Sequence, residues 1–203
     1  NLSIKLSALD ALFDPIDPVG VTRRVGERLK SLLRVAKEHQ AFINVDMESY
    51  EKKDLTLQIF KRVLDDEEFR RVSDIGIVIQ CYLRDSERDL HALRDWAAAR
   101  GTPVWVRLVK GAYWDYETVH AQANDWPIPV FQQKWESDAN YERLTRFLLR
   151  NHDTLRPALG SHNVRSLAHA MAVAEHLSIP NNGFELQMLY GMADAEKQAL
   201  VDR

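Results

Sequence analysis

The chain has 203 residues, of which 45% are hydrophobic and 28% charged, and its formal net charge is −3. This balance fits one globular domain over residues 1–203 with a substantial core, and it lacks the basic surface that nucleic-acid binding requires. No apolar run approaches the ~20 residues of a membrane-spanning helix. The single cysteine, Cys81, excludes an internal disulfide, and we expect it to pack in the core.

Segments with strand-like and helix-like patterns alternate along the chain. We expect strands near 2–6, 41–45, 75–83, 104–109, 158–163 and 184–189. We expect helices near 19–39, 55–64, 86–100, 141–148, 167–176 and 193–201. Ser86 is expected to cap the third helix and Gly101 to end it. A polar segment around 126–129 is expected to separate the fourth strand from the next helix.

Apolar strands that alternate with helices indicate a parallel sheet, which can be an open doubly wound sheet or an eight-fold barrel. No GxGxxG follows any strand, which counts weakly against an open dinucleotide-binding sheet. Polar residues stand at one end of each expected strand, as at the active-site face of a barrel. The pattern therefore favours an α/β fold of the (βα)8 TIM type. About six consecutive βα units fit in this length, because a full barrel takes ~250 residues.

The stretch from Val104 to Asp115, VWVRLVKGAYWD, is the most informative part of the chain. Strand alternation sends Val104, Val106 and Leu108 to one side and Arg107 to the other. A charged residue in such an apolar strand is costly unless something pairs with it. Arg107 therefore either forms an internal ion pair or faces a ligand, and the residues alone leave both readings open.

Other strand ends carry polar groups that need partners. Asp46 and Glu48 share a side and can stabilise an arginine or, less plausibly, bind a metal ion. Gln80 and Gln187 lie in apolar strands, where a buried amide must be hydrogen-bonded. Two such glutamines, a buried arginine and rim aromatics suit a flat heterocycle of flavin size. The chain shows no nucleophile with a base beside it, as acyl transfer would require.

Six motifs, in this order, resemble the proline dehydrogenase family, and within it the dehydrogenase domain of the bifunctional proline utilization A enzymes. They are KLSAL at 5–9, DME at 46–48, QCYL at 80–83, RLVKGAYWD at 107–115, SHN at 161–163 and FELQMLYGM at 184–192. The resemblance implies a (βα)8 barrel holding FAD, and oxidation of L-proline to 1-pyrroline-5-carboxylate by hydride transfer to flavin N5. It also implies that the chain is a fragment without the first strand, the eighth strand and the last helix.

The resemblance assigns roles residue by residue. Arg107, Lys5 and Asp46 are implied to be catalytic, with Arg107 beside flavin N5. Lys5, Asp46, Tyr113 and Leu189 are implied to bind the substrate. The implied cofactor-binding residues are Asp46, Met47, Gln80, Arg107, Val109, Lys110, Gly111, Ala112, Tyr113, Trp114, Lys134, Ser161, His162, Asn163, Gln187 and Met188. No metal site is implied.

The implied partners are L-proline and a quinone or other electron acceptor. Whether an aldehyde dehydrogenase domain is fused to this one in a longer chain is left open. The implied location is cytoplasmic, with a peripheral position at the inner membrane as an alternative through quinone reduction. The competing function is a barrel aldolase or lyase with Lys5 or Lys110 as the Schiff base, which leaves Arg107, Gln80 and Gln187 unexplained.

Overall fold

In the computed structural model of the protein, residues 1–202 are described, and Arg203, the last residue of the expected domain, lies outside the described residues. The strands of this range are β1 (Leu2–Lys5), β2 (Ile43–Asp46), β3 (Ile75–Gln80), β4 (Val104–Val109), β5 (Leu155–Gly160) and β6 (Glu185–Gln187). Its helices are α1 (Pro18–Glu38), α2 (Tyr50–Leu64), α3 (Ser86–Arg100), α4 (Trp114–Ala123), α5 (Lys134–Arg150), α6 (Val164–His176) and α7 (Asp194–Val201), with 3₁₀ turns η1 (Leu6–Leu9) and η2 (Asn181–Gly183).

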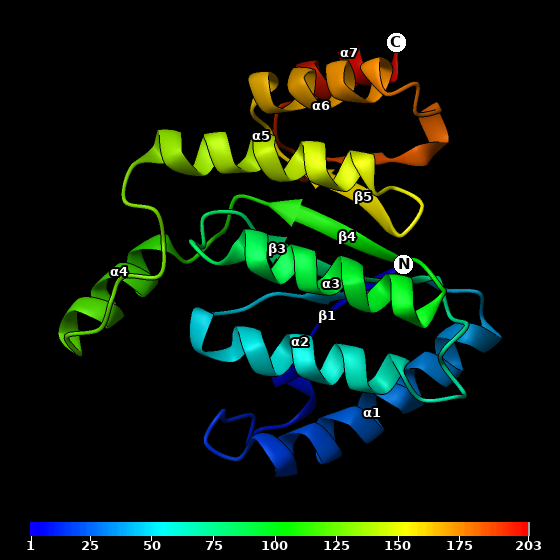
Figure 1. Ribbon diagram of the computed structural model, residues 1–203, viewed down its shortest axis with the longest axis vertical. Helices are drawn as coiled ribbons and strands as arrows, with labels where there is room; N and C mark the ends of the chain where they lie inside the picture. Colours follow the sequence, from blue (N-terminus) through cyan, green and yellow to red (C-terminus); the bar gives the residue numbers. More distant parts are fainter. Residues whose placement is uncertain (203) are drawn as a thin grey trace.

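All the strands form one parallel sheet in which they follow one another in chain order. Figure 1 shows α1, α2, α3, α5 and α6 stacked on one side of the strands. The sheet face toward these helices is apolar: Val104, Val106 and Leu108 of β4 are fully buried there. The core lies between this face and the helices, and Cys81 packs in it as expected.

The opposite face of the sheet is concave. Arg107 on β4 hydrogen-bonds Ser3 on β1 with Nη1 to Oγ at 3.1 Å, and Gln187 on β6 with Nε to Oε1 at 2.7 Å. Neighbouring strands lie ~4.8 Å apart, so a flat sheet would hold β1 about 14 Å from β4. One side chain can reach both outer strands only if the sheet curls around it. The expected barrel architecture is confirmed, and the open doubly wound alternative is excluded.

The bounds of three expected strands are corrected. The third strand ends at Gln80 rather than Leu83, because Leu83 N bonds back to Gln80 O at 3.3 Å and the chain turns there. The fifth strand begins at Leu155, three residues earlier than expected, and ends before Ser161. The last strand is shorter than expected and covers Glu185–Gln187.

Two local expectations about helices are also corrected. Ser86 is not the cap of α3: Asp85 holds that position, while the buried Ser86 hydroxyl donates to Leu83 O at 2.8 Å. Gly101 ends α3 in the left-handed conformation, as expected. Helix α4 was not expected at all, and it lies between the end of β4 and the polar 126–129 segment. Among residues 1–202, no helix is both long and apolar enough to cross a bilayer.

Candidate active site

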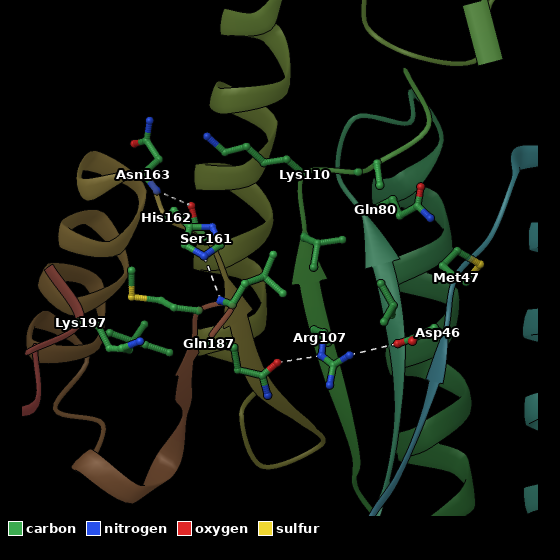
Figure 2. Close-up of a pocket in the computed structure, with 18 of the residues that line it drawn as sticks. Asp46, Met47, Gln80, Arg107, Lys110, Ser161, His162, Asn163, Gln187 and Lys197 are labelled. Atoms are coloured by element: carbon green, nitrogen blue, oxygen red, sulfur yellow. Dashed lines mark hydrogen bonds and ion pairs between the residues drawn. The ribbon is translucent and has the colours of Figure 1, made fainter. Parts of the chain in front are cut away.

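The carboxyl ends of the strands open into one cavity of about 1200 Å³. Lys5, Asp46, Gln80, Arg107, His162 and Gln187 all line it, so the expected convergence of these strand-end residues on one face is confirmed. Figure 2 shows where Asp46, Gln80, Arg107, His162 and Gln187 lie on separate strands and loops around this cavity. The volume exceeds the ~300–1,000 Å³ of common small-molecule sites.

Arg107 is the central cation of this cavity. Its Nη1 donates to Asp46 Oδ1 at 3.0 Å, and its Nε donates to Gln187 Oε1 at 2.7 Å. Figure 2 shows the guanidinium held between these two residues. Asp46 also accepts from Asn44 Nδ2 at 3.0 Å. Arg107 therefore forms the internal ion pair that the sequence allowed, and it also lines the cavity, where a ligand could contact it.

Glu48 does not join this group, although it shares a side with Asp46 in an extended chain. Its carboxylate instead accepts from the Ser7 hydroxyl at 2.6 Å and pairs with Lys52 at 3.6 Å. The two carboxylates therefore diverge after β2 ends at Asp46.

Lys5 lies at the exposed rim of the cavity. Its Nζ donates to the Tyr113 hydroxyl at 3.4 Å, which joins β1 to the segment that follows β4. This hydrogen bond, with further help from the carboxylates of Glu48 and Asp46, raises the pKa of Lys5 above its usual value. Lys5 is therefore a cation at neutral pH, suited to attract an anionic group of a substrate.

Gln80 supplies a buried amide on the cavity wall. Its Nε2 donates to Glu48 O at 3.1 Å, while its Oε1 is buried without a hydrogen-bond partner in the described part of the chain. A buried carbonyl left unmatched costs about 1–3 kcal/mol. Such an acceptor in a cavity wall suits a ligand that carries an N–H group.

Two lysines give another part of the cavity wall a positive character. Lys110 and Lys134 both pair with Asp138, Lys134 at 2.7 Å. Burial acts to raise the pKa of Asp138, but the hydrogen bonds from the two lysines outweigh it and hold the pKa below its usual value. Two cations share one carboxylate, so the cluster carries a net positive charge that suits a phosphate-like group.

Residues 161–163 lie where β5 passes into α6. Asn163 caps α6 by accepting from Ser166 N at 3.0 Å, and its own N–H donates to Ser161 Oγ at 3.1 Å. His162 Nε2 accepts from Leu189 N at 2.9 Å, so this ring nitrogen is unprotonated. The histidine thereby ties the end of β5 to the loop after β6, as Figure 2 shows.

The cavity contains nearly all of the residues assigned from the resemblance, including Met47, Val109, Gly111, Ala112 and Met188. Trp114 is the exception: it does not line the cavity, and its indole N–H donates to Phe131 O at 2.8 Å. Six further residues line the cavity but are not predicted from the sequence: Val78, Gly160, Leu186, Lys197, Leu200 and Val201. Strand period could have found Val78, two residues before Gln80, and helical spacing could have grouped Lys197 with Leu200 and Val201.

A curled parallel sheet with helices outside and a cavity at the carboxyl ends of its strands has the architecture of a βα-barrel domain. A family model described as proline dehydrogenase matches residues 1–203. The chain belongs to the proline dehydrogenase family.

Individual relatives agree with this assignment. The chain is 31% identical to the bifunctional protein PutA of Escherichia coli (strain K12) over 96% of its own length and 15% of that protein's. It is 31% identical to proline dehydrogenase 2 of Bacillus subtilis (strain 168), over 87% of its own length and 51% of the relative's. A crystal structure of proline utilization A from Bdellovibrio bacteriovorus, inactivated by N-propargylglycine, superposes with a TM-score of 0.97 at 48% identity. That match covers the whole of this chain and 21% of the crystallised one.

Proposed function

We propose that this chain carries the active-site barrel of a flavin-dependent enzyme that oxidises L-proline to 1-pyrroline-5-carboxylate. Membership of the proline dehydrogenase family supports the substrate. The observation that carries the proposal is Arg107, a cation fixed at the cavity by Asp46 and Gln187. A preorganised cation of this kind stabilises negative charge that develops during a reaction.

The residues of the cavity fit FAD. The volume of about 1200 Å³ is large enough for a dinucleotide, and the unmatched Gln80 carbonyl suits the N–H edge of a flavin ring. Lys110 and Lys134 suit its pyrophosphate, and their shared Asp138 keeps them in place. We assign the flavin ring to the walls made by Arg107, Gln80, Gln187 and their neighbours. The further parts of FAD are assigned to the wall that carries residues 161–163.

FAD, when bound, supplies the acceptor for the hydride that leaves the proline ring. The protein's own part is to bind, orient and cover the substrate. Lys5 offers a cation to the proline carboxylate, and Asp46 fixes Arg107 in place. We assign Tyr113 and Leu189, which line the cavity, to a cover over the bound substrate.

The aldolase alternative has no support. A Schiff-base lysine needs a lowered pKa so that its amine is free. The pKa of Lys5 is raised, and Lys110 is paired with Asp138.

We further propose that the chain supplies six consecutive units of an eight-fold barrel, with the remaining units and a fused aldehyde dehydrogenase domain carried by adjoining sequence. A quinone is the proposed acceptor that re-oxidises the flavin. The proposed location is the cytoplasm, with contact to the inner membrane during quinone reduction.

The test is the flavin content of the intact natural protein and of two matched variants. Gln80→Leu removes the amide, with its unmatched carbonyl, from the cavity wall. Gln58→Leu makes the same change on the exposed surface of α2. We expect one FAD per chain in the wild type and in Gln58→Leu, with FAD binding weakened about tenfold or more in Gln80→Leu. Proline must bleach the wild-type flavin. A wild type without flavin, or a flavin that proline leaves oxidised, would refute the proposal.

A further inference from the structure

Helix α4 follows directly on the cavity residue Tyr113 and stands away from the other helices, as Figure 1 shows. It has no apolar stripe that could bury against the barrel. Its buried residues are Glu117, Thr118 and Ala121, so a carboxylate occupies the middle of its inward face. A buried carboxylate is costly unless it is hydrogen-bonded.

Glu117 meets its partner on a distant helix. Its Oε1 accepts from Tyr50 N at 2.7 Å. Tyr50 is the first residue of α2, and the capping residue before it, Ser49, makes no side-chain cap. The first N–H groups of a helix lack partners within the helix. Glu117 therefore supplies from α4 a cap that α2 lacks in its own sequence.

Burial and the N-terminus of α2 shift the pKa of the Glu117 carboxyl in opposite directions. Burial raises the pKa of Glu117, and the neighbouring Glu51 adds to that shift. The Tyr50 N–H and His120 favour the charged form and offset part of the shift. The start of α2 also favours a negative charge.

This hydrogen bond, with a longer contact of 3.9 Å between His120 Nε2 of α4 and Glu51 Oε2 of α2, connects two walls of the cavity. On one side, Glu117 lies one turn after Tyr113, and Glu117 N donates to Tyr113 O at 2.9 Å. Tyr113 in turn accepts from Lys5 at the rim. On the other side, Tyr50 follows shortly after Asp46, whose carboxylate holds Arg107. The spacing between the wall with Tyr113 and the wall with Asp46 therefore depends on where Glu117 holds α4.

We propose that Glu117 is a positioning residue of the active site, which holds Tyr113 over Lys5 by tying the first turn of α4 to the N-terminus of α2. The role of Tyr113 over the substrate rests on the proposed function. The tie between the two helices stands on its own geometry.

The most specific test removes the hydrogen-bond donor, the Tyr50 N–H, and leaves the Glu117 carboxylate in place. Tyr50→Pro deletes the N–H that Glu117 accepts from, and proline is tolerated at the first position of a helix. Ser49 already has φ −62° and ψ 157°, which suits a residue before proline. Tyr50→Ala is the matched control, because it removes the same side chain and keeps the N–H. Steady-state kinetics with L-proline are measured in the intact natural protein.

We expect the KM for proline to rise on the order of tenfold in Tyr50→Pro relative to Tyr50→Ala, with a smaller change in kcat, because a misplaced cover weakens substrate positioning. Glu117→Ala should show a similar rise, and Glu117→Gln, which keeps an acceptor, should restore KM to within about threefold of wild type. Glu117→Ala should have little further effect in the Tyr50→Pro background, because the two changes break the same bond. Thr118→Ala, the neighbouring buried change in α4, should leave KM near wild type.

Equal KM values in Tyr50→Pro and Tyr50→Ala would overturn the proposal, as would a full additional effect of Glu117→Ala in Tyr50→Pro. Hydrogen exchange of residues 113–123 gives a readout independent of turnover and applies if Glu117→Ala folds poorly. We expect faster exchange in Tyr50→Pro than in Tyr50→Ala, and equal exchange would refute the tie. A wild type that fails to oxidise proline would instead refute the proposed function, while the exchange comparison still decides whether Glu117 holds α4.

Discussion

Substitution of Arg107 by methionine tests the centre of the cavity. The change keeps an unbranched side chain of similar length and removes the guanidinium. It deletes the hydrogen bonds to Asp46 at 3.0 Å, Gln187 at 2.7 Å and Ser3 at 3.1 Å. These partners belong to β2, β6 and β1, so the substitution also removes a link across the concave face of the sheet.

We expect Arg107→Met to change the stability of the fold only modestly and the rate of flavin reduction strongly. Asp46 keeps Asn44 as a donor at 3.0 Å, and its side chain is 29% exposed, so water replaces part of the lost ion pair. We expect a loss of stability of about 1–2 kcal/mol, toward the lower end for a broken charged hydrogen bond. The rate of flavin reduction should fall much further, on the order of 10²–10³-fold, as when a preorganised charge-stabilising donor is removed.

Stopped-flow measurement of flavin bleaching by L-proline, without oxygen, separates these effects in the intact natural protein. Arg107→Lys is the control for charge: its compact ammonium lacks the planar guanidinium in which Nε and Nη1 bond different partners, so we expect it to recover only part of the rate. Urea unfolding measures the stability of each variant. If L-proline bleached the flavin of Arg107→Met at the wild-type rate, the role given to the guanidinium would be refuted.

Three further changes have defined outcomes. Gly111 has φ +131°, and an added Cβ would meet the Tyr82 ring at 2.5 Å, so Gly111→Ala should lower the melting temperature and weaken flavin binding; an unchanged melting curve would contradict this. The lowered pKa of Asp138 means that its pairing stabilises the fold above its unfolded pKa of ~3.9 and that this contribution is lost as pH falls through the lowered value. In Asp138→Asn, the free energy of unfolding measured with urea should therefore fall less steeply below about pH 4 than in the wild type, and an unchanged dependence on pH would refute this expectation. The same variant should bind FAD more weakly if Lys110 and Lys134 hold the pyrophosphate. The 203-residue chain expressed alone should retain little FAD and should aggregate, because in residues 1–202 each outer strand of the sheet pairs on one side only. A longer chain that includes the adjoining sequence should restore FAD binding. A soluble monomer of the 203-residue chain with tightly held FAD would contradict the proposal that barrel units are missing from it.

The barrel was predictable because its determinants are local. Alternation along β4 separates the buried Val106 from Arg107, and a polar group stands at or near the carboxyl end of each strand. The family motifs then named most of the residues that line the cavity. Which partner each residue takes was not predictable: the sequence left open that Arg107 would contact Ser3, because that contact depends on the curvature of the whole sheet.

The missed features share a different physical origin. Helix α4 has a polar inward face centred on Glu117, so it lacks the apolar period by which helices are recognised. The start of β5 was missed because Pro157 interrupts its apolar run, although Pro157 pairs in register with Val106. Ser86 was assigned as a cap from its residue type, whereas its hydroxyl is used in a buried contact with the turn after β3.

The proposed proline oxidation is tested most directly by the absorption spectrum of the purified intact protein before and after anaerobic addition of L-proline. We expect flavin bands that proline bleaches, with 1-pyrroline-5-carboxylate formed in equal amount. We also expect borohydride with a carbonyl substrate to leave Lys5 and Lys110 unmodified. A protein without flavin bands, or one in which borohydride traps a substrate on either lysine, would contradict the proposed function.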